Sequence, residues 1–328
     1  MPPLDDLTVL VTGATDGLGR ACAIDLAGQG ATVLVHGRDE ARGRATLDEI
    51  RATTGNDRLH WYKADLSSLD EVRRLADEAG RDHDRLDVLL SNAGIGATVP
   101  GGGARQVSAD GHELRFAVNY LAGFLLSGLL WPLLSRSAPA RVIHVSSAGQ
   151  EPIDFGDVML TRGYSGVRAY CQSKLAQVLL GFDQAEAYPG SGIAVASLHP
   201  ATYMPTKIVP SPISTVADGV EATDRLVAEV PADEMNGRWF NTTRAARADA
   251  QAYDAGARRR LRELSEELTG ITAPWSRKGA RPPRGAGALA LCRVSRCDRR
   301  GARCCAGSRC RPRAARTRRS GAGRCCCR

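Results

Sequence analysis

The sequence predicts an α/β fold in which a doubly wound, parallel sheet of about seven strands is flanked by helices. Along residues 1–200, short apolar segments alternate with amphipathic helical segments, which is the pattern of consecutive βαβ units. The first segment, LTVLVT at Leu7–Thr12, is apolar almost throughout, as expected of a parallel strand covered on both faces. Apolar residues make up 43% of the chain, which is enough for a large core and excludes a wholly disordered protein.

The expected elements follow one another in a regular order along these 200 residues. The apolar segments predict strands at Leu7–Thr12, Thr32–His36, Leu59–Lys63, Leu86–Ser91, Arg141–Val145 and Ile193–Leu198. The segments between them predict helices at about Gly17–Gln29, Arg38–Thr53, from Ser68 onward, Ser108–Leu133 and Val167–Ala187. The most apolar run, Leu121–Leu134, is too short to span a bilayer, so we expect a buried helix and no membrane span.

Residues 200–276 are less regular. The proline-rich segment TYMPTKIVPSP at 202–212 predicts a loop. A helix at about Val216–Glu229, a short strand at Gly237–Phe240 and a charged amphipathic helix at Ala245–Leu268 follow. The last helix ends at Thr269-Gly270, a typical C-terminal stop. We therefore expect a single folded domain over residues 1–276.

Residues 277–328 differ sharply in composition from the rest of the chain. They contain 17 Lys and Arg with one acidic residue, which leaves residues 1–276 with 27 basic and 35 acidic side chains and a net charge of −8. This basic tail has few aliphatic residues and no periodicity, so we expect it to be disordered. Its composition is what an out-of-frame, GC-rich coding sequence would yield, and our hypothesis is that it is non-native and silent. The alternative is that its arginine clusters bind nucleic acid.

Cysteine usage and charge bound the location and the partners of the folded part. Eight of the ten cysteines lie in the tail, where Cys292 to Cys310 are not spaced as C-x-x-C pairs, so no metal site is expected. Cys22 and Cys171 do not make a disulfide framework, and the N-terminal segment lacks the basic region of a signal peptide. We therefore expect a cytoplasmic protein. The acidic charge of residues 1–276 argues against nucleic-acid binding by the folded domain.

A glycine-rich turn between the first strand and the first helix predicts a dinucleotide site. Gly13, Gly17 and Gly19 lie in TGATDGLG, with the spacing G-x-x-x-G-x-G. Without Cβ atoms they allow the backbone to turn tightly and to approach a pyrophosphate at the positive end of the helix. A glycine-rich turn alone is weak evidence, but its place between a buried strand and a helix favours dinucleotide binding.

The end of the second strand indicates which dinucleotide is bound. This strand ends in Val35-His36-Gly37-Arg38, without a carboxylate where NAD-binding proteins place an Asp or Glu for the ribose hydroxyls. Arg38 follows at once and suits the 2′-phosphate of NADP. Asp39 could instead hold the ribose of NAD, although it better explains the start of the next helix as its N-cap. We therefore expect NADP, with NAD as the alternative.

A tyrosine and a lysine on one predicted helix suggest acid–base chemistry. Tyr170 and Lys174 are four residues apart and so share a helix face. A nearby ammonium lowers the pKa of a phenol toward the range of a general acid/base. Such a pair is common on protein surfaces, and alone it predicts little.

Further polar residues follow strands or interrupt apolar segments. The strands ending near Val145 and Ser91 are followed by Ser146-Ser147 and by Asn92-Ala93-Gly94, at the sheet edge where ligands of open α/β sheets bind. Asn119 lies within an otherwise apolar helical segment, where a buried amide needs partners. Ordinary turn serines and a satisfied core asparagine are the structural alternatives.

Together these motifs form a recognisable pattern. TGATDGLG, SNAG, Asn119, VSSAG and YCQSK, in this order and spacing, resemble the short-chain dehydrogenase/reductase family, which has a Rossmann-type fold. The resemblance covers about residues 5–270. The segments AYCQSKLAQVLL and GRWFN…AYD…LRELSEELTG are most similar to the retinol-dehydrogenase-like branch and its bacterial relatives.

The resemblance implies a role for each matching residue. Tyr170 would be the catalytic acid/base, and Lys174 would hold the nicotinamide ribose and lower the pKa of Tyr170. Ser147, rather than Ser146, would bind the substrate oxygen, and Asn119 would support a water-mediated proton relay to Lys174. The cofactor-binding residues that the resemblance implies are Gly13, Thr15, Asp16, Gly17, Leu18, Gly19, Arg38, Asp65 (to adenine), Leu66, Asn92, Ala93, Gly94, Tyr170, Lys174, Pro200 and Thr202.

The sequence therefore predicts an NADP-dependent oxidoreductase that transfers hydride between the cofactor and an alcohol/carbonyl group. Apolar residues in segments 150–166 and 202–216 suggest a hydrophobic small molecule as substrate. A dinucleotide sensor without turnover is the rival interpretation, although it has no need of Ser147, Tyr170 and Lys174 together. The resemblance also implies a homodimer or homotetramer formed through the long helices at about 108–133 and 167–187.

Overall fold

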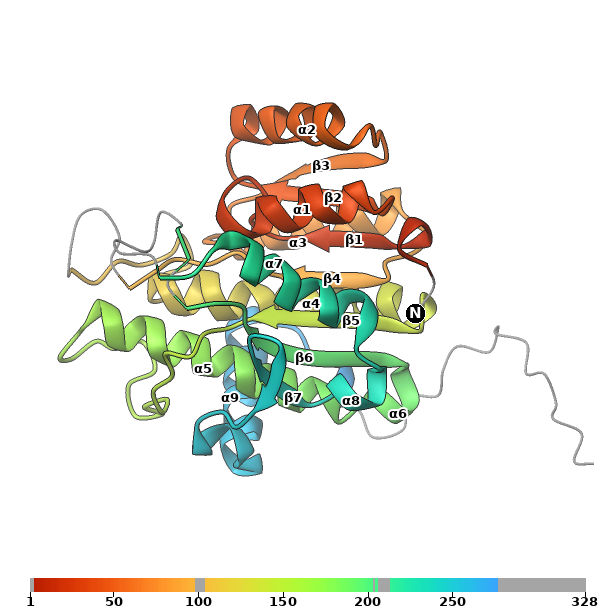
Figure 1. Cartoon of the computed structure of the whole chain (residues 1–328). Helices are drawn as coiled ribbons and strands as arrows, with labels where there is room; N and C mark the ends of the chain where they lie inside the picture. Colours follow the sequence, from red (N-terminus) through yellow and green to blue (C-terminus); the bar gives the residue numbers. More distant parts are fainter. Residues whose placement is uncertain (1–2, 98–103, 203, 206–212, 277–328) are drawn as a thin grey trace, which may run out of the picture. The chain divides into compact units, whose positions relative to one another are not determined.

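The chain folds around one eight-stranded sheet (Figure 1). The computed structural model describes residues 3–97, 104–202, 204–205 and 213–276, so the predictions for the tail at 277–328 lie outside the described residues. The strand order is β3-β2-β1-β4-β5-β6-β7-β8, and every neighbouring pair is parallel except β7 and β8. The strands are β1 (Thr8–Val11), β2 (Thr32–Gly37), β3 (Leu59–Lys63), β4 (Val88–Ser91), β5 (Ala140–Val145), β6 (Ile193–His199), β7 (Arg238–Asn241) and β8 (Arg244–Ala246).

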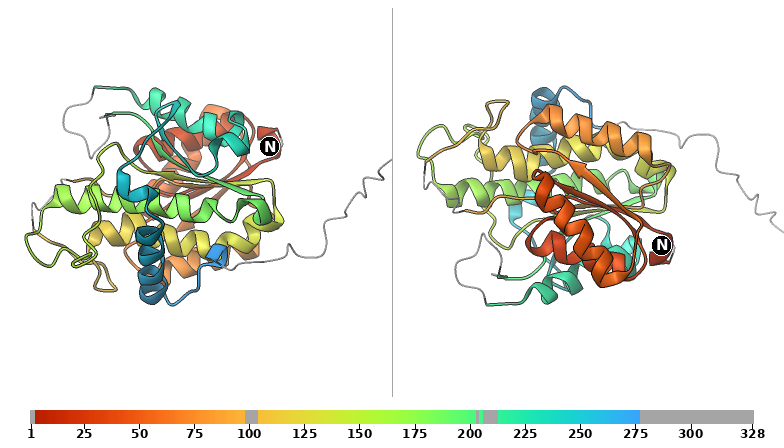
Figure 2. Two further views of the ribbon diagram at one scale, coloured as in Figure 1. Left: turned by 90° about the horizontal axis from the view of Figure 1, so that it is seen from below. Right: turned by 90° about the horizontal axis from the view of Figure 1, so that it is seen from above.

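Helices cover both faces of this sheet, which confirms the predicted doubly wound, Rossmann-type architecture (Figure 2). One layer holds α1 (Gly17–Gly28), α2 (Glu40–Thr54) and α7 (Val216–Asp224), and the other holds α3 (Leu69–Asp82), α4 (Ala122–Arg136) and α5 (Gly166–Ala185). α9 (Ala255–Thr269) packs on α5. Shorter elements are α6 (Tyr188–Ser191), α8 (Ala232–Met235), the π-helical turns η2 (Phe116–Leu121) and η3 (Arg225–Glu229), and the 3₁₀ turns η1 (Leu4–Asp6), η4 (Ala250–Tyr253) and η5 (Pro274–Ser276).

The alternation of side chains along each strand builds two apolar cores. Val9 and Val11 of β1 belong to the core beneath α1 and α2, whereas Leu10 between them belongs to the core beneath α3 and α4. All three are fully buried, which is why this strand reads as a continuous apolar run. Each such side chain contributes about 1.5–3 kcal/mol when it leaves water.

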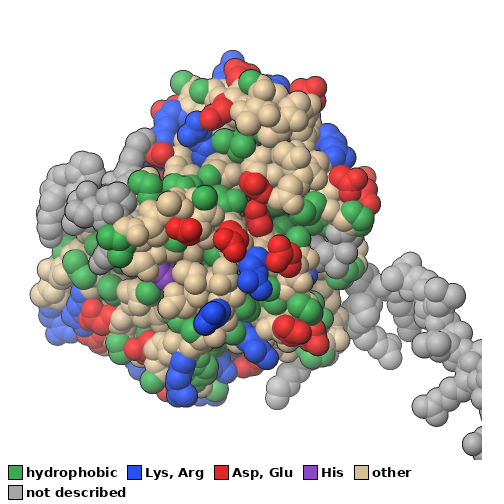
Figure 3. Space-filling model, in the orientation of Figure 1, with side chains coloured by type: hydrophobic (Ala, Val, Ile, Leu, Met, Phe, Trp, Pro, Cys, Tyr) green, Lys and Arg blue, Asp and Glu red, His purple; other side chains and the backbone are tan. Residues whose placement is uncertain are grey.

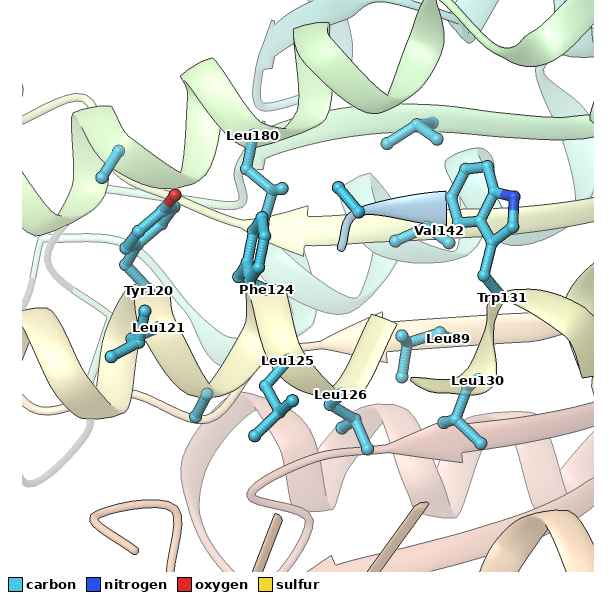
Figure 4. Packing of buried hydrophobic residues seen from close by; sticks show 14 of the residues in the cluster. Leu89, Tyr120, Leu121, Phe124, Leu125, Leu126, Leu130, Trp131, Val142 and Leu180 are labelled. Atoms are coloured by element: carbon cyan, nitrogen blue, oxygen red, sulfur yellow. The ribbon is translucent and has the colours of Figure 1, made fainter. Parts of the chain in front are cut away.

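The most apolar helix of the described chain lies in one of these cores. The helix from Phe116 to Arg136 has 21 residues and is long and apolar enough to cross a membrane, but 83% of its most apolar window is buried inside the protein. Figure 4 shows Phe124 of this helix pointing toward Leu180 of α5, and Trp131 lying beside Val142 of β5. The helix is therefore packed as the buried core helix that the sequence predicts.

Two predicted element boundaries were wrong. The helix expected from Ser108 begins only after Glu113, because the Ser108 hydroxyl accepts hydrogen bonds from the amides of Asp110 and His112 and holds a turn there. The helix expected from Ala245 is replaced at its start by β8, an eighth strand that pairs antiparallel with β7. β8 is exposed along its whole length, so it carries no apolar pattern that the sequence could reveal.

The helices expected to form an oligomer interface are already covered within the chain. α9 packs on α5, and Trp275 contacts Phe124 edge-to-face and Trp131 at a tilt, with ring centroids 5.3 Å apart in each case. These contacts already occupy part of the surfaces of α4 and α5, and a dimer or tetramer through these helices stays a prediction.

On the face that Figure 3 shows, acidic and basic side chains are interspersed rather than gathered into one basic surface.

Candidate active site

The carboxyl ends of the parallel strands bring the predicted site residues to one edge of the sheet. The chain reverses its winding direction between β1 and β4, the place where open α/β sheets bind ligands. Asn92 fastens these two strand ends together: its Nδ2 donates to the Thr12 carbonyl at 2.8 Å, and its amide donates to Thr12 Oγ1 at 2.9 Å. The expected structural role of Asn92 at this edge therefore has a direct geometric basis.

The glycine-rich turn after β1 needs its glycines for close approach. Gly13 has a φ of +68° and Gly17 a φ of +51°, a region that other residues rarely adopt. A Cβ on Gly19 would lie 2.4 Å from both Asn92 Nδ2 and the Gly13 carbonyl oxygen. The Asp16 side chain caps α1 by accepting from the Gly17 amide at 2.9 Å. The turn thus presents the N-terminus of α1 to the sheet edge, as an anion site requires.

The residues after β2 separate the two cofactor alternatives. Asp39 is the N-cap of α2, where its carboxylate accepts from the Arg42 amide at 3.0 Å, so it has the capping role expected of it. Arg38 is exposed at the strand end. Arg42, which the sequence reasoning missed, forms an ion pair of 2.8 Å with Asp16 and donates to the Thr15 carbonyl at 3.1 Å. Arg42 therefore joins Arg38 as a second candidate for binding the 2′-phosphate.

On the other side of β1, the structure brings together the residues predicted to be catalytic. Ser147 and Tyr170 meet at Gly149, where a Cβ would lie 3.6 Å from Ser147 Oγ and 3.9 Å from Tyr170 Cε1, and Lys174 Nζ lies 5.7 Å from the centroid of the Tyr170 ring. Ser147 follows β5 and the other two residues lie on α5. The neighbouring Ser146 is buried and engaged with the Leu198 carbonyl and the Trp239 indole, which leaves Ser147 as the serine at the site.

Burial sets the proton affinities of this pair. Desolvation raises the pKa of Tyr170 above its usual value, and the hydrogen bond from Ser147 opposes this. Desolvation lowers the pKa of Lys174 to about 7. Lys174 is not among the groups that shift the pKa of Tyr170 here, and the expectation that it lowers this pKa stays a prediction.

Lys174 is held by two acceptors. Its Nζ donates to the Val145 carbonyl and to Gln177 Oε1, both at 2.9 Å. Gln177 is a residue that sequence reasoning missed, although its place one turn after Lys174 on the same helix was a usable signal. An ammonium has three donors, so one remains for a ligand.

Asn119 sits in the π-helical turn η2 and braces the loop after β4. Its Oδ1 accepts from the Ile95 amide at 2.7 Å, and its Nδ2 donates to the Ile95 carbonyl at 3.1 Å and to Ser173 Oγ at 2.9 Å. A Cβ on Gly94 would lie 3.3 Å from Asn119 Oδ1 and 3.4 Å from Lys174 Nζ. Asn119, Gly94 and Lys174 are therefore neighbours, as a relay between them requires.

The remaining predicted residues also follow strands at this edge, on both sides of β1. Asp65 and Leu66 follow β3, which three strands (β2, β1 and β4) separate from β5, so these residues lie with Arg38 on the β2–β3 side of the edge rather than beside the catalytic pair. Thr202 follows β6, where its hydroxyl is 3.1 Å from His199 Nε2. An extended dinucleotide would reach from the residues after β3 to the residues after β5.

Sequence comparison identifies the family. The family model described as short chain dehydrogenase matches residues 7–213. The chain belongs to the short-chain dehydrogenase family. Human retinol dehydrogenase 13 is 34% identical to this short-chain dehydrogenase over 297 residues, covering 84% of this chain and 88% of that protein. Human retinol dehydrogenase 11 is 32% identical over 277 residues, covering 80% and 86%. These matches support the predicted retinol-dehydrogenase-like branch.

Solved structures agree with this family assignment. An uncharacterised protein from Mycobacterium paratuberculosis superposes with a TM-score of 0.68 and 30% identity, covering 84% of this chain and 97% of that one. A protein from Escherichia coli CFT073, assigned to the short-chain dehydrogenases and complexed with NADPH, has a TM-score of 0.60 and 28% identity, covering 74% and 100%. This short-chain dehydrogenase therefore has the fold of an oxidoreductase family with NADPH-bound structural relatives.

Proposed function

We propose that this chain is an NADP-dependent oxidoreductase that interconverts an alcohol and a carbonyl group on an apolar small molecule. The observation that carries the proposal is that Ser147 and Lys174 both lie beside Tyr170, at the sheet edge that also holds the glycine turn. The hydride would come from, or go to, the nicotinamide of the bound cofactor.

Tyr170 and Ser147 supply the proton chemistry. We infer that both hydroxyls bind one substrate oxygen, because the Ser147 and Tyr170 side chains both lie within 4 Å of a Cβ built on Gly149. In the direction of reduction, Tyr170 donates its proton to the oxygen that becomes a hydroxyl, and Ser147 holds that oxygen in place. A phenol whose pKa is raised by burial is a protonated donor at neutral pH, which suits this direction.

Lys174 would bind the cofactor ribose and adjust the pKa of Tyr170. With two donors held by Val145 and Gln177, its third N–H is available to a ribose hydroxyl. A cofactor hydroxyl there would help to retain the ammonium form, which then draws the pKa of Tyr170 down. Asn119 would keep a proton path open by fixing the loop at Ile95 beside this lysine.

The residues at the adenosine end fit NADP better than NAD. Arg38 is exposed at the end of β2, and Asp39 is committed to capping α2. The NADPH complex of the Escherichia coli relative supports the same cofactor. Arg38 and Arg42 would bind the 2′-phosphate, with Arg42 exchanging part of its ion pair with Asp16 for the phosphate.

Support for an apolar substrate comes from the relatives rather than from the described side chains near the site. Of the segment 150–166, Ile153 and Leu160 are buried, and Phe155, Val158 and Met159 pack against the core, so these side chains are accounted for by packing. Residues 203 and 206–212 lie outside the described part of the chain. The relatives named for retinol favour an apolar alcohol or aldehyde.

The cytoplasmic location expected from the sequence stays part of this proposal. Both described cysteines are free, which is consistent with it.

The cofactor proposal is tested by fluorescence titration with NADPH and NADH. We expect tighter binding of NADPH, and Arg38→Ala should weaken NADPH binding by about tenfold or more while NADH binding is unchanged. Arg44→Ala is the matched control, because Arg44 is an exposed arginine of α2 that pairs with Glu40 on the same helix. Preference for NADH, or equal effects of both substitutions, would contradict the NADP proposal.

A carbonyl panel tests the enzyme proposal. Tyr170→Phe should lower turnover by about 10²–10⁴-fold with little change in NADPH affinity, whereas Tyr188→Phe in α6 should leave turnover unchanged. NADPH binding that is tight in the full chain, with no turnover of any aldehyde or ketone, would favour the sensor interpretation. Salt-sensitive DNA retention that disappears when residues 277–328 are removed would favour nucleic-acid binding by the tail.

A further inference from the structure

A buried histidine links two loops of the cofactor edge. His36 lies near the end of β2, and only 2% of its surface is exposed. The Gly13 amide donates to His36 Nδ1 at 3.1 Å, and His36 Nε2 lies 3.1 Å from the carbonyl oxygen of Ala64. Because an amide donates and a carbonyl accepts, only one form of the ring satisfies both partners: a neutral imidazole with its proton on Nε2.

The main chain of His36 strengthens the same connection. Its carbonyl accepts from the Ala14 amide at 2.8 Å. Two consecutive residues of the glycine turn, Gly13 and Ala14, therefore donate hydrogen bonds to His36. The turn is otherwise unusual, because Gly13 has a φ of +68° and a Cβ there would lie 2.9 Å from the Cα of Ala93. The amide of Gly13 is thus engaged by His36, and its expected contribution to the site is the shape of the turn rather than a donor to the pyrophosphate.

The other nitrogen reaches the turn that follows β3. Ala64 immediately precedes Asp65, the residue expected at the adenine, and its own amide donates to the Gly37 carbonyl. A single ring therefore spans from the end of β1 to the end of β3 across β2. It joins the turn expected at the pyrophosphate to the turn expected at the adenine.

We propose that His36 is a positioning residue for the dinucleotide, whose imidazole fixes the spacing between the glycine turn and the turn at Ala64–Asp65. It acts through these two turns and does not itself touch the cofactor. This inference rests on the proposed function, since it assumes a dinucleotide at this edge. A binding site for an extended ligand gains affinity when its separated contact points are held in place before binding.

The electrostatic setting of His36 agrees with a neutral ring. Burial lowers the pKa of His36 to about 4, although the carboxylates of Asp65 and Glu71 act in the opposite direction. The ring therefore stays neutral at pH 7, and Nδ1 remains an acceptor for Gly13. Sequence inspection could not find this role, because a histidine in an apolar strand looks like any packed core residue.

The proposal is tested with two substitutions at His36 and one matched control. His36→Leu removes both side-chain hydrogen bonds, whereas in His36→Asn the side-chain oxygen can take the place of Nδ1 and accept from Gly13. The control is His144→Leu in β5, a fully buried histidine whose Nε2 lies 2.8 Å from Gln184 Oε1 and which contacts neither turn. For each full-length variant the melting temperature and the Kd for NADPH and for 2′-phospho-ADP-ribose are measured.

We expect His36→Leu to raise both Kd values by about tenfold, since the two turns are then no longer held at a fixed spacing before the ligand binds. His36→Asn should recover most of this affinity. His144→Leu should lower the melting temperature but leave both Kd values within about twofold of the wild type. Kd values that are unchanged in His36→Leu, or raised equally in the His144 variant, would overturn the proposal.

A spectroscopic measurement on the wild type covers the case in which His36→Leu does not fold. Nitrogen-15 NMR of the imidazoles at pH 7 should show His36 as the neutral form protonated on Nε2, and either other form would overturn the proposal. Failure of the folded wild type to bind NADPH and NADH would overturn the proposed function itself and this inference with it. Wild-type binding with unaltered affinity in the His36 variants would overturn the inference alone.

Discussion

Replacing Lys174 by methionine should make the protein more stable at neutral pH while it destroys the site. Lys174 is 5% exposed, and burial lowers its pKa from 10.5 to about 7. The unfolded chain therefore binds a proton between pH 7 and 10.5 that the folded chain does not bind. Wild-type stability falls as the pH drops through this window and levels off below about pH 7.

The size of the effect follows from this window. A fall from 10.5 to about 7 corresponds to about 5 kcal/mol of unfolding free energy, at about 1.4 kcal/mol per pH unit. Methionine removes this penalty but leaves the Val145 carbonyl and Gln177 Oε1 without a donor, at a cost of about 1 kcal/mol each. The net expectation at pH 7 is a variant more stable by about 2–3 kcal/mol.

The assay is urea unfolding followed by tryptophan fluorescence at several values between pH 7 and 9.5. The advantage of Lys174→Met over the wild type should shrink as the pH rises, by up to about 1.4 kcal/mol per pH unit. Lys63→Met is the control, because Lys63 is exposed on β3 and its substitution should show no such trend. A Lys174→Met variant that is less stable than the wild type at pH 7, or a difference independent of pH, would refute the reasoning.

Two further predictions concern packing and a buried ion pair. Gly43→Ala should destabilise the protein by about 1–3 kcal/mol, because a Cβ there would lie 2.3 Å from the Trp61 ring. In Gly80→Ala of α3 the new Cβ meets no atom within 4 Å, so this variant should be more stable by about 0.5–1 kcal/mol. Urea unfolding measures both changes. Arg115→Met should cost about 3–5 kcal/mol, since it leaves the carboxylate of Glu113, also 1% exposed, without its cation. Adding Glu113→Gln should recover part of that loss, and a double variant as unstable as the sum of the two single variants would contradict this coupling.

Features that depend on local pattern could be predicted from the sequence. The six parallel strands up to residue 200 all lie within two residues of their expected places, and the fourth, which begins at Val88 rather than Leu86, differs most. Most of these strands are buried on both faces, which leaves a continuous apolar run in the sequence. Asp39 was recognisable as a cap and Gly270 as a helix stop, with a φ of +68°, because both act on their own helix.

Features that depend on distant partners could not be predicted. β8 exists because Arg244–Ala246 lies against β7, and its exposed residues give no sign of this pairing. The start of η2 is set by a turn at Ser108, which overrides the helical tendency of the following residues. The link from His36 to Gly13 and the ion pair of Arg42 with Asp16 join residues that are more than 20 positions apart.

Deuterium transfer tests the central claim of hydride transfer assisted by Tyr170. The full-length protein is incubated with NADPH carrying deuterium at C4 of the nicotinamide, together with retinal and a panel of apolar aldehydes and ketones, and the products are analysed by mass spectrometry. The wild type should place one deuterium on the carbinol carbon of at least one product, and Tyr170→Phe should form about a hundredfold less of it or lower still. Tight NADPH binding with no deuterium in any product would contradict the account and identify a dinucleotide sensor instead.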